Sequence, residues 1–207
     1  MTTTTTPTGS VLASLRALIP RVRLDFDDAR HLAERQAARL ERLLGGDVTE
    51  TAVASLPRIQ IIRESLPTSG LSYWNGRAWI IALNTADGNA RQRFTLLHEF
   101  KHIVDHGAAR RLYRSQWEAE RAADYFAACA LMPKPALKRA FCTMTQDVAA
   151  LAEHFGVSQQ ALRVRLEQTG LVDRPSFTRE RCARPIATPW HEAQRFVLAR
   201  TTSYERK

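Results

Sequence analysis

The chain has 207 residues, of which 44% are hydrophobic and 25% charged, as in an ordinary globular protein of one domain or two small ones. Its three cysteines (Cys129, Cys142 and Cys182) include no Cys-x-x-Cys pair, which argues against a disulfide framework and fits a reducing compartment. Uninterrupted apolar runs, such as residues 78–83, are far short of the roughly 20 residues that span a membrane. The composition therefore excludes a transmembrane protein and a disulfide-stapled secreted domain.

The net charge of +9 is unevenly distributed. Residues 173–207 form a basic tail, and within it residues 174–207 carry eight Lys and Arg against three Asp and Glu. Such a tail either attracts nucleic acid or an acidic partner, or is simply solvated. The Thr-rich start of the chain is expected to be disordered, and we extend this tail over residues 1–20. It lacks the basic start and long apolar stretch of a secretory signal, so we expect a cytoplasmic protein.

The apolar spacing predicts a helix, a small sheet and then several helices. The first helix covers residues 27–44. Strands are expected near residues 59–62, 71–74 and 78–83, the last two joined by Asn75-Gly76, a strong hairpin signal. We predict an antiparallel sheet from this pattern. Further helices follow at residues 91–106, 117–131, 135–141, 146–155, 159–168 and, beyond a Pro-spaced stretch, 190–199. The order indicates an α+β fold.

The helix predicted at residues 91–106 carries the pattern His98-Glu99-x-x-His102. Residues four apart lie on one helical face, about 6 Å apart along the axis, so both imidazoles can reach one Zn²⁺. Glu99 is rotated by about 100° from His98, where it can take a proton from an activated water. A chance occurrence of the motif is improbable inside a helix with apolar residues to pack it.

A zinc site of this kind needs a third protein ligand. Glu120 is the better candidate, because it lies 18 residues past His102 on a helix that can return antiparallel. Asp124 follows one turn later, where it can accept a hydrogen bond from a ligating imidazole. His106 is eight residues beyond His98 and about 12 Å along a continuous helix, which is too far to share the ion. We expect His106 to cap the helix instead.

The combined pattern resembles the ImmA/IrrE family of metallopeptidases. The resemblance rests on residues 93–102 (RFTLLHEFKH), on Glu120-x-x-Ala-Asp124-x-Phe-Ala and on Ala130-Leu-Met-Pro133, and it extends more weakly over residues 59–171. It implies a minimal zincin-like domain over residues 21–144, with zinc held by His98, His102 and Glu120 and with Glu99 as the base. Manganese is a second possible ion, because two His and a carboxylate accept several divalent metals. Asp124 stands where the family usually has Asn, a departure that resembles the Glu-x-x-x-Asp helix of gluzincins.

Residues 145–172 resemble a helix-turn-helix unit with Gly156 in the turn and Ser158 as the cap of the second helix. Gln159, Gln160, Arg163 and Arg165 could then face a major groove. Alternatively, the pair packs on the peptidase core, as similar pairs do in the family. We expect an extended substrate to bind along residues 79–83 as an edge strand. Tyr113 and Tyr125 are possible donors to the oxyanion, and Lys101 adds a charge that could tune substrate choice.

The sequence thus predicts a zinc-dependent endopeptidase. The resemblance implies a protein substrate, in particular a helix-turn-helix repressor that controls stress or mobile-element genes. The alternative is a regulator that binds DNA or a partner protein on a non-catalytic zincin scaffold. Glu99 favours the enzyme, because a scaffold without catalysis has no physical need for that carboxylate.

Overall fold

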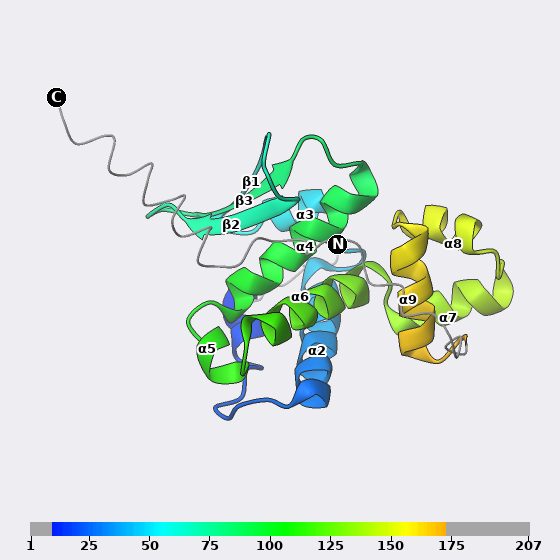
Figure 1. Cartoon of the computed structure of the whole chain (residues 1–207), viewed down its shortest axis with the longest axis horizontal. Helices are drawn as coiled ribbons and strands as arrows, with labels where there is room; N and C mark the ends of the chain where they lie inside the picture. The colour runs from blue at the N-terminus through cyan, green and yellow to red at the C-terminus, as the bar shows by residue number, and fades with distance from the viewer. Residues whose placement is uncertain (1–9, 173–207) are drawn as a thin grey trace, which may run out of the picture.

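The computed structural model describes residues 10–172. Its helices and strands are α1 (Val11–Arg16), α2 (Phe26–Leu44), α3 (Glu50–Ala54), β1 (Ile59–Glu64), β2 (Gly70–Trp74), β3 (Trp79–Asn84), α4 (Asn89–Asp105), α5 (Ala109–Leu112), α6 (Gln116–Leu131), α7 (Lys134–Thr143), α8 (Val148–Phe155) and α9 (Gln159–Thr169) (Figure 1). The predicted α+β class is confirmed, and each predicted element within residues 10–172 is present. The helix predicted at residues 190–199 and the basic tail lie outside the described part. Within it, no helix combines the length and the apolar character needed to cross a membrane.

The three strands form a mixed sheet, so our prediction of an antiparallel sheet was wrong. The strand order is β1-β3-β2. The Asn75-Gly76 hairpin joins β2 and β3 antiparallel, as predicted, but β1 pairs with β3 in parallel. The reason lies in β3, which pairs with β1 along one edge and with β2 along the other, and whose four inner residues are all buried. This strand is therefore central, and residues 79–83 cannot serve as the edge strand that we expected.

The prediction of a disordered tail over residues 1–20 was wrong for its second half, because residues 11–16 form a helix. Helix α1 covers Val11–Arg16, and the side chain of Leu15 is fully buried in the core. The Arg16 guanidinium donates hydrogen bonds to the carbonyl oxygens of Ile103 (2.8 Å) and Val104 (3.2 Å). These are carbonyls of the last turn of α4, which lack partners within the helix. Helix α1 thus closes the end of the helix that carries the His-Glu-x-x-His motif.

The elements are layered in the order sheet, α4, α6, α2 (Figure 1). Helix α4 lies against β2 and β3 on one side and against α6 on the other. Close packing of the two helices follows from small residues on α6, since Ala123 and Ala127 are fully buried. Phe100 of α4 and Phe126 of α6 stack with ring centroids 6.4 Å apart. This packing fixes the rotation and spacing of the two helices that carry the motif residues.

Helices α8 and α9 pack on this core through an arginine contact. Leu151, Leu162 and other buried residues of the pair belong to the same apolar cluster as α4 and α6. At the turn between α8 and α9, Gly156 adopts a left-handed φ of 61°, and the Arg93 guanidinium donates to the carbonyl oxygens of Phe155 (3.1 Å) and Gly156 (2.9 Å). A Cβ atom on residue 156 would lie 1.9 Å from Arg93 Nη1. Glycine therefore allows the turn to dock directly on α4.

Candidate metal centre

The two histidines of the motif project from one face of α4. His98 and His102 lie one turn apart, with ring centroids 4.8 Å apart and their Nε2 atoms separated by 3.1 Å. The ring of His98 is buried, whereas His102 keeps 16% of its side chain exposed. The helical spacing thus brings the two nitrogens together, as the sequence predicts, and the site opens to solvent on the side of His102.

Glu120 of α6 completes the group. Its Oε2 atom lies 3.0 Å from Nε2 of His98 and 3.5 Å from Nε2 of His102. In a tetrahedral zinc site with bonds of about 2.0–2.1 Å, ligand atoms stand roughly 3.3 Å apart, so the three atoms match the spacing that such an ion requires. Among the described residues, His98, His102 and Glu120 form the one group of three or more potential ligands with converging donor atoms. His106 is not part of it.

Asp124 lies behind His98, on the side away from Glu120. Its Oδ1 atom is 2.9 Å from Nδ1 of His98. In a neutral ring, an Nδ1–H that donates to Asp124 leaves the Nε2 lone pair directed at Glu120 and His102. Three electron-pair donors then converge on one point. This chemistry fits a cation, and the residues present are suited to hold a divalent metal.

The electrostatics of the site lead to the same conclusion. Burial lowers the pKa of His98, but the hydrogen bonds with Asp124 and Glu120 outweigh burial and raise this pKa to about 10. Burial raises the pKa of Glu120, whereas the hydrogen bonds with His102 and His98 have the larger effect and hold it well below its usual value. The carboxylate of Glu120 is therefore held in its charged form, and the site favours a positive charge, such as a metal ion, beside it.

Glu99 is held by a strand that the sequence interpretation did not connect with it. The carboxylate is buried, with 3% of the residue exposed, and its Oε2 accepts a 2.7 Å hydrogen bond from the hydroxyl of Ser72 in β2. Its other oxygen, Oε1, is buried and has no hydrogen-bond partner within the described residues. One oxygen is thus fixed by the protein, and the hydrogen-bonding capacity of the other is unused within the described residues.

The approach of β2 to α4 depends on a small residue. A Cβ atom on Gly70 would lie 2.4 Å from Cγ2 of Thr95 and 2.9 Å from the carbonyl oxygen of Ala82. Gly70 and Ser72 share one face of the strand, because side chains alternate. Small residues at positions 70 and 72, the first of them just before the strand predicted at residues 71–74, are the signal that could have identified this contact in the sequence.

Two other expectations about the site were wrong. Lys101 does not add charge to it, because its ammonium is buried and contacts Asp105 at 2.6 Å and Gln36 at 2.7 Å. The Tyr113 hydroxyl donates to Asp105 in the same buried network, so it does not point to the metal centre. The prediction that His106 caps the helix is confirmed, because His106 follows the last residue of α4 and its backbone N–H donates to the carbonyl oxygen of Ile103. Burial and the nearby Arg16 lower the pKa of its imidazole, and the ring packs on Trp79, so these surroundings do not favour the charged ring that the helix dipole would stabilise.

The surface expected to read DNA is incomplete. Gln159, Gln160 and Arg163 are exposed, but Arg165 is 1% exposed and its Nε donates to the carbonyl oxygen of Met132 at 3.1 Å. The guanidinium also lies over the ring of Tyr125, 5.4 Å from its centroid. Arg165 therefore anchors α9 to the end of α6 and cannot reach a DNA groove, and Tyr125 faces this contact rather than the metal centre.

A buried His-Glu-x-x-His helix, a third carboxylate from an adjacent helix and a small sheet beside them define a zincin-like metallopeptidase domain. Comparison with known families agrees. The M78 peptidase model, described as the IrrE N-terminal-like domain, matches residues 57–167. The chain therefore belongs to the ImmA/IrrE family of metallopeptidases, as its motifs indicate.

The fold is also found among solved structures. A protein described as a Mycobacterium tuberculosis transcriptional regulator aligns with a TM-score of 0.55 and 17% sequence identity, over 81% of this chain and 54% of the other. This chain thus spans about half the length of that protein, and at this identity the similarity concerns the fold alone. No curated protein matches the sequence significantly.

Proposed function

We propose that the protein is a zinc-dependent endopeptidase. The observation that carries this proposal is the buried Oε1 of Glu99, which has no hydrogen-bond partner among the described residues, on a carboxylate whose charge acts on His98 of the converging group His98, His102 and Glu120. A purely structural zinc site has four protein ligands and needs no adjacent base, whereas a catalytic site has three and an open position.

Each residue of the site has a role in this proposal. His98, His102 and Glu120 hold the ion, and Asp124 orients His98 through Nδ1. Bound zinc supplies the Lewis acidity that activates water and polarises the scissile carbonyl. Glu99, fixed by Ser72, takes the proton from the attacking water at Oε1 and delivers it to the leaving amine. Manganese is chemically compatible with the same ligands.

The substrate is proposed to bind along β2 rather than along β3. Strand β2 is an edge of the sheet, since it pairs with β3 alone among the described strands. An extended peptide can add to such an edge through main-chain hydrogen bonds. Because Ser72 of this strand contacts Glu99, a peptide on the outer edge of β2 would lie close to the base. A protein with an extended, accessible segment is the matching substrate class.

We further propose that this substrate is a helix-turn-helix repressor in the cytoplasm. This proposal rests on the family to which the chain belongs. The alternative, a non-catalytic regulator that binds DNA through residues 145–172, has weaker support, because Arg165 is buried and only part of the expected surface remains. We retain the helix pair as a unit that packs on the peptidase core.

The test combines metal content with cleavage. The zinc-loaded parent and its Glu99→Gln variant are incubated with purified helix-turn-helix repressors from the genome that encodes the chain, and products are mapped by mass spectrometry. We expect one repressor to be cut at one bond by the parent. Glu99→Gln should bind equal zinc, because Glu99 is not a ligand, and should cleave at least about a hundredfold more slowly.

Two results would contradict the proposal in different ways. Cleavage by Glu99→Gln at the parental rate would mean that Glu99 is not the base. Failure of the folded parent to bind zinc or manganese would contradict the proposal that the protein is a metallopeptidase. Binding of DNA by the parent at low salt, lost on Arg163→Ala, would then favour the regulator.

A further inference from the structure

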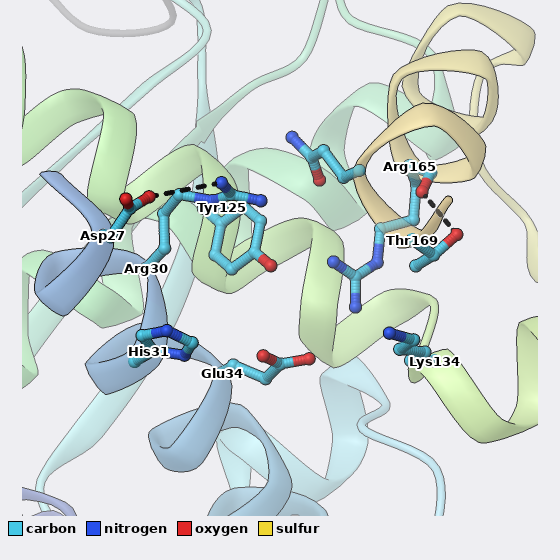
Figure 2. A pocket seen from close by; sticks show the side chains of 9 residues that line it. Asp27, Arg30, His31, Glu34, Tyr125, Lys134, Arg165 and Thr169 are labelled. Atoms are coloured by element: carbon cyan, nitrogen blue, oxygen red, sulfur yellow. Dashed lines mark hydrogen bonds and ion pairs between the residues drawn. The ribbon is translucent and has the colours of Figure 1, made fainter. Parts of the chain in front are cut away.

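A second polar cavity lies away from the metal centre, between α2, α6 and α9 (Figure 2). Its volume is about 190 Å³, the space of roughly six water molecules at about 30 Å³ each. Nearly all its lining side chains are polar or charged: Asp27, Arg30, His31, Glu34, Tyr125, Lys134, Arg165, Gln168 and Thr169. The sequence interpretation assigned a role to only two of them, Tyr125 and Arg165, and neither role involved this cavity.

The guanidinium of Arg165 is the unusual group in this cavity. It is almost completely buried, yet no carboxylate lies within ion-pair distance of it among the described residues. Its Nε donates to Met132, but Nη1 is buried and has no hydrogen-bond partner there. A buried charge without a counter-charge is costly, so an anion beside Nη1 would relieve a real energetic deficit. In Figure 2, this guanidinium points into the cavity toward Tyr125 and Glu34.

The other charges leave the cavity with a positive excess. Asp27 is matched by Arg30, whose Nη1 lies 3.6 Å from its Oδ1. What remains are two cations, Arg165 and the exposed Lys134, against the single carboxylate of Glu34. Lys134 makes no recorded hydrogen bond or ion pair with the rest of residues 10–172. The lining side chains therefore carry one net positive charge, which suits a bound anion.

The cavity also contains hydrogen-bond acceptors, which favour an anion that can donate a hydrogen bond. Oε1 of Gln168 is buried without a partner within residues 10–172, and Glu34 presents a carboxylate that forms no ion pair with Arg165. An oxyanion with its own O–H group can satisfy both kinds of site: oxygens accept from Arg165 and Lys134, and the O–H donates to Gln168 or Glu34. A phosphate group that retains a proton has this pattern, whereas a simple carboxylate does not.

We propose that this cavity binds a small phosphate, either inorganic phosphate or a phosphate monoester, with Arg165 as the buried anchor and Lys134 at the rim. Arg165 joins α9 to Met132, the residue that follows α6, and α6 carries Glu120. The bound phosphate therefore stabilises the docking of α8 and α9 on the helix of the metal centre. The proposal is independent of peptide hydrolysis.

The test uses the full chain and titration calorimetry with inorganic phosphate at constant ionic strength. Glycerol phosphate serves as the monoester and acetate as the carboxylate control. Lys134→Gln and Lys138→Gln form a matched pair, because both lysines are exposed on α7 but only Lys134 lines the cavity. We expect saturable 1:1 binding that is at least about fivefold weaker in Lys134→Gln, unchanged in Lys138→Gln and lost in Arg165→Met. Tighter binding of either phosphate compound identifies the source.

Several outcomes would overturn the proposal. The first is the absence of saturable phosphate binding by the parent. The second is an equal loss of affinity in Lys134→Gln and Lys138→Gln. The third is an affinity that Lys134→Gln leaves unchanged, as expected if phosphate binds at the metal centre instead. If the parent is silent but Glu34→Gln binds phosphate, then Glu34 is the internal counter-ion of Arg165 and the site is not a ligand site. Acetate binding as tight as that of phosphate would also contradict the assignment, because acetate has no O–H to donate.

Discussion

The hydroxyl of Ser72 and the carboxylate of Glu99 are joined by a 2.7 Å hydrogen bond between the sheet and the motif helix. This bond occupies one carboxylate oxygen and leaves the other without a partner within residues 10–172. A base that must reach one proton benefits from such a fixed orientation, because the freedom of its side chain is already lost before substrate binds. Ser72 is therefore a positioning residue in the proposed reaction.

Replacement of Ser72 by alanine should lower kcat without loss of metal. A hydrogen bond to a charged group contributes about 1.5–3 kcal/mol, so its loss corresponds to roughly a tenfold to hundredfold slower reaction. Zinc content and KM should stay close to parental values, because Ser72 contacts neither the ligands nor, as proposed, the substrate side chains. Ser72→Thr keeps the hydroxyl and should restore most of kcat. If Ser72→Ala has the same kcat as the parent, the hydrogen bond from Ser72 is not needed to position Glu99.

Metal content should separate ligands from their neighbours. Glu120→Ala and His102→Ala each remove one of three converging atoms, and both should retain less than about a tenth of the parental zinc after dialysis. His106→Ala is the matched control for the histidine and Glu153→Ala, an exposed glutamate, for the carboxylate. Both controls should retain about one zinc per chain. Loss of zinc in His106→Ala together with retention in Glu120→Ala would reverse the ligand assignment.

Asp124→Asn should weaken zinc binding without abolishing it. The amide can still contact Nδ1 of His98, but it lacks the charge that makes this imidazole a strong electron donor. Changes of this kind cost about tenfold to a hundredfold in metal affinity. Competition with a coloured chelator measures the effect, and Asp147→Asn, at an exposed helix cap, should leave affinity unchanged. An unaltered affinity in Asp124→Asn would mean that the carboxylate is not needed behind His98.

The sequence was sufficient for the helices but not for the sheet. Helical periodicity and caps are local signals, and α2 begins one residue before the predicted start at residue 27, with the side chain of Asp25 accepting from the backbone N–H of Asp28. The pairing of β1 with β3 is a contact between distant residues, and the hairpin signal at Asn75-Gly76 describes only one side of β3. The run of apolar residues in β3 was the available sign of a central strand. Helix α1 was missed because six residues carry little periodic information.

The predicted metal group depended on spacing within helices, and here sequence reasoning placed the side chains well. His98 and His102 converge because four residues make one turn, and Glu120 and Asp124 follow the same rule on α6. Spacing does not reveal which face of a helix is buried against a distant partner. Lys101 and Arg165 were therefore interpreted as exposed functional charges, although both are buried. Long-range packing decides such cases.

Lys101 and Asp105 of α4 form a buried ion pair, and its contribution to stability can be tested separately from activity. Nζ of Lys101 lies 2.6 Å from Oδ2 of Asp105, to which the Tyr113 hydroxyl also donates at 2.7 Å. Burial lowers the pKa of Lys101, while the charge of Asp105 opposes that shift. Burial and Asp105 raise the pKa of Tyr113 above its usual value. The buried charges of Lys101 and Asp105 are thus stabilised by each other and not by solvent.

Lys101→Met should therefore destabilise the fold by about 3–5 kcal/mol, because Asp105 is left as an uncompensated buried charge. The double variant Lys101→Met/Asp105→Asn removes that charge and keeps an acceptor for Tyr113, so it should recover more than half of the loss. Lys138→Met, at an exposed site, should change stability by less than about 0.5 kcal/mol. Urea unfolding at one fixed zinc concentration measures all three, since bound metal itself adds stability. If the double variant is as unstable as Lys101→Met alone, the loss arises from packing around the lysine stem and not from the buried charge.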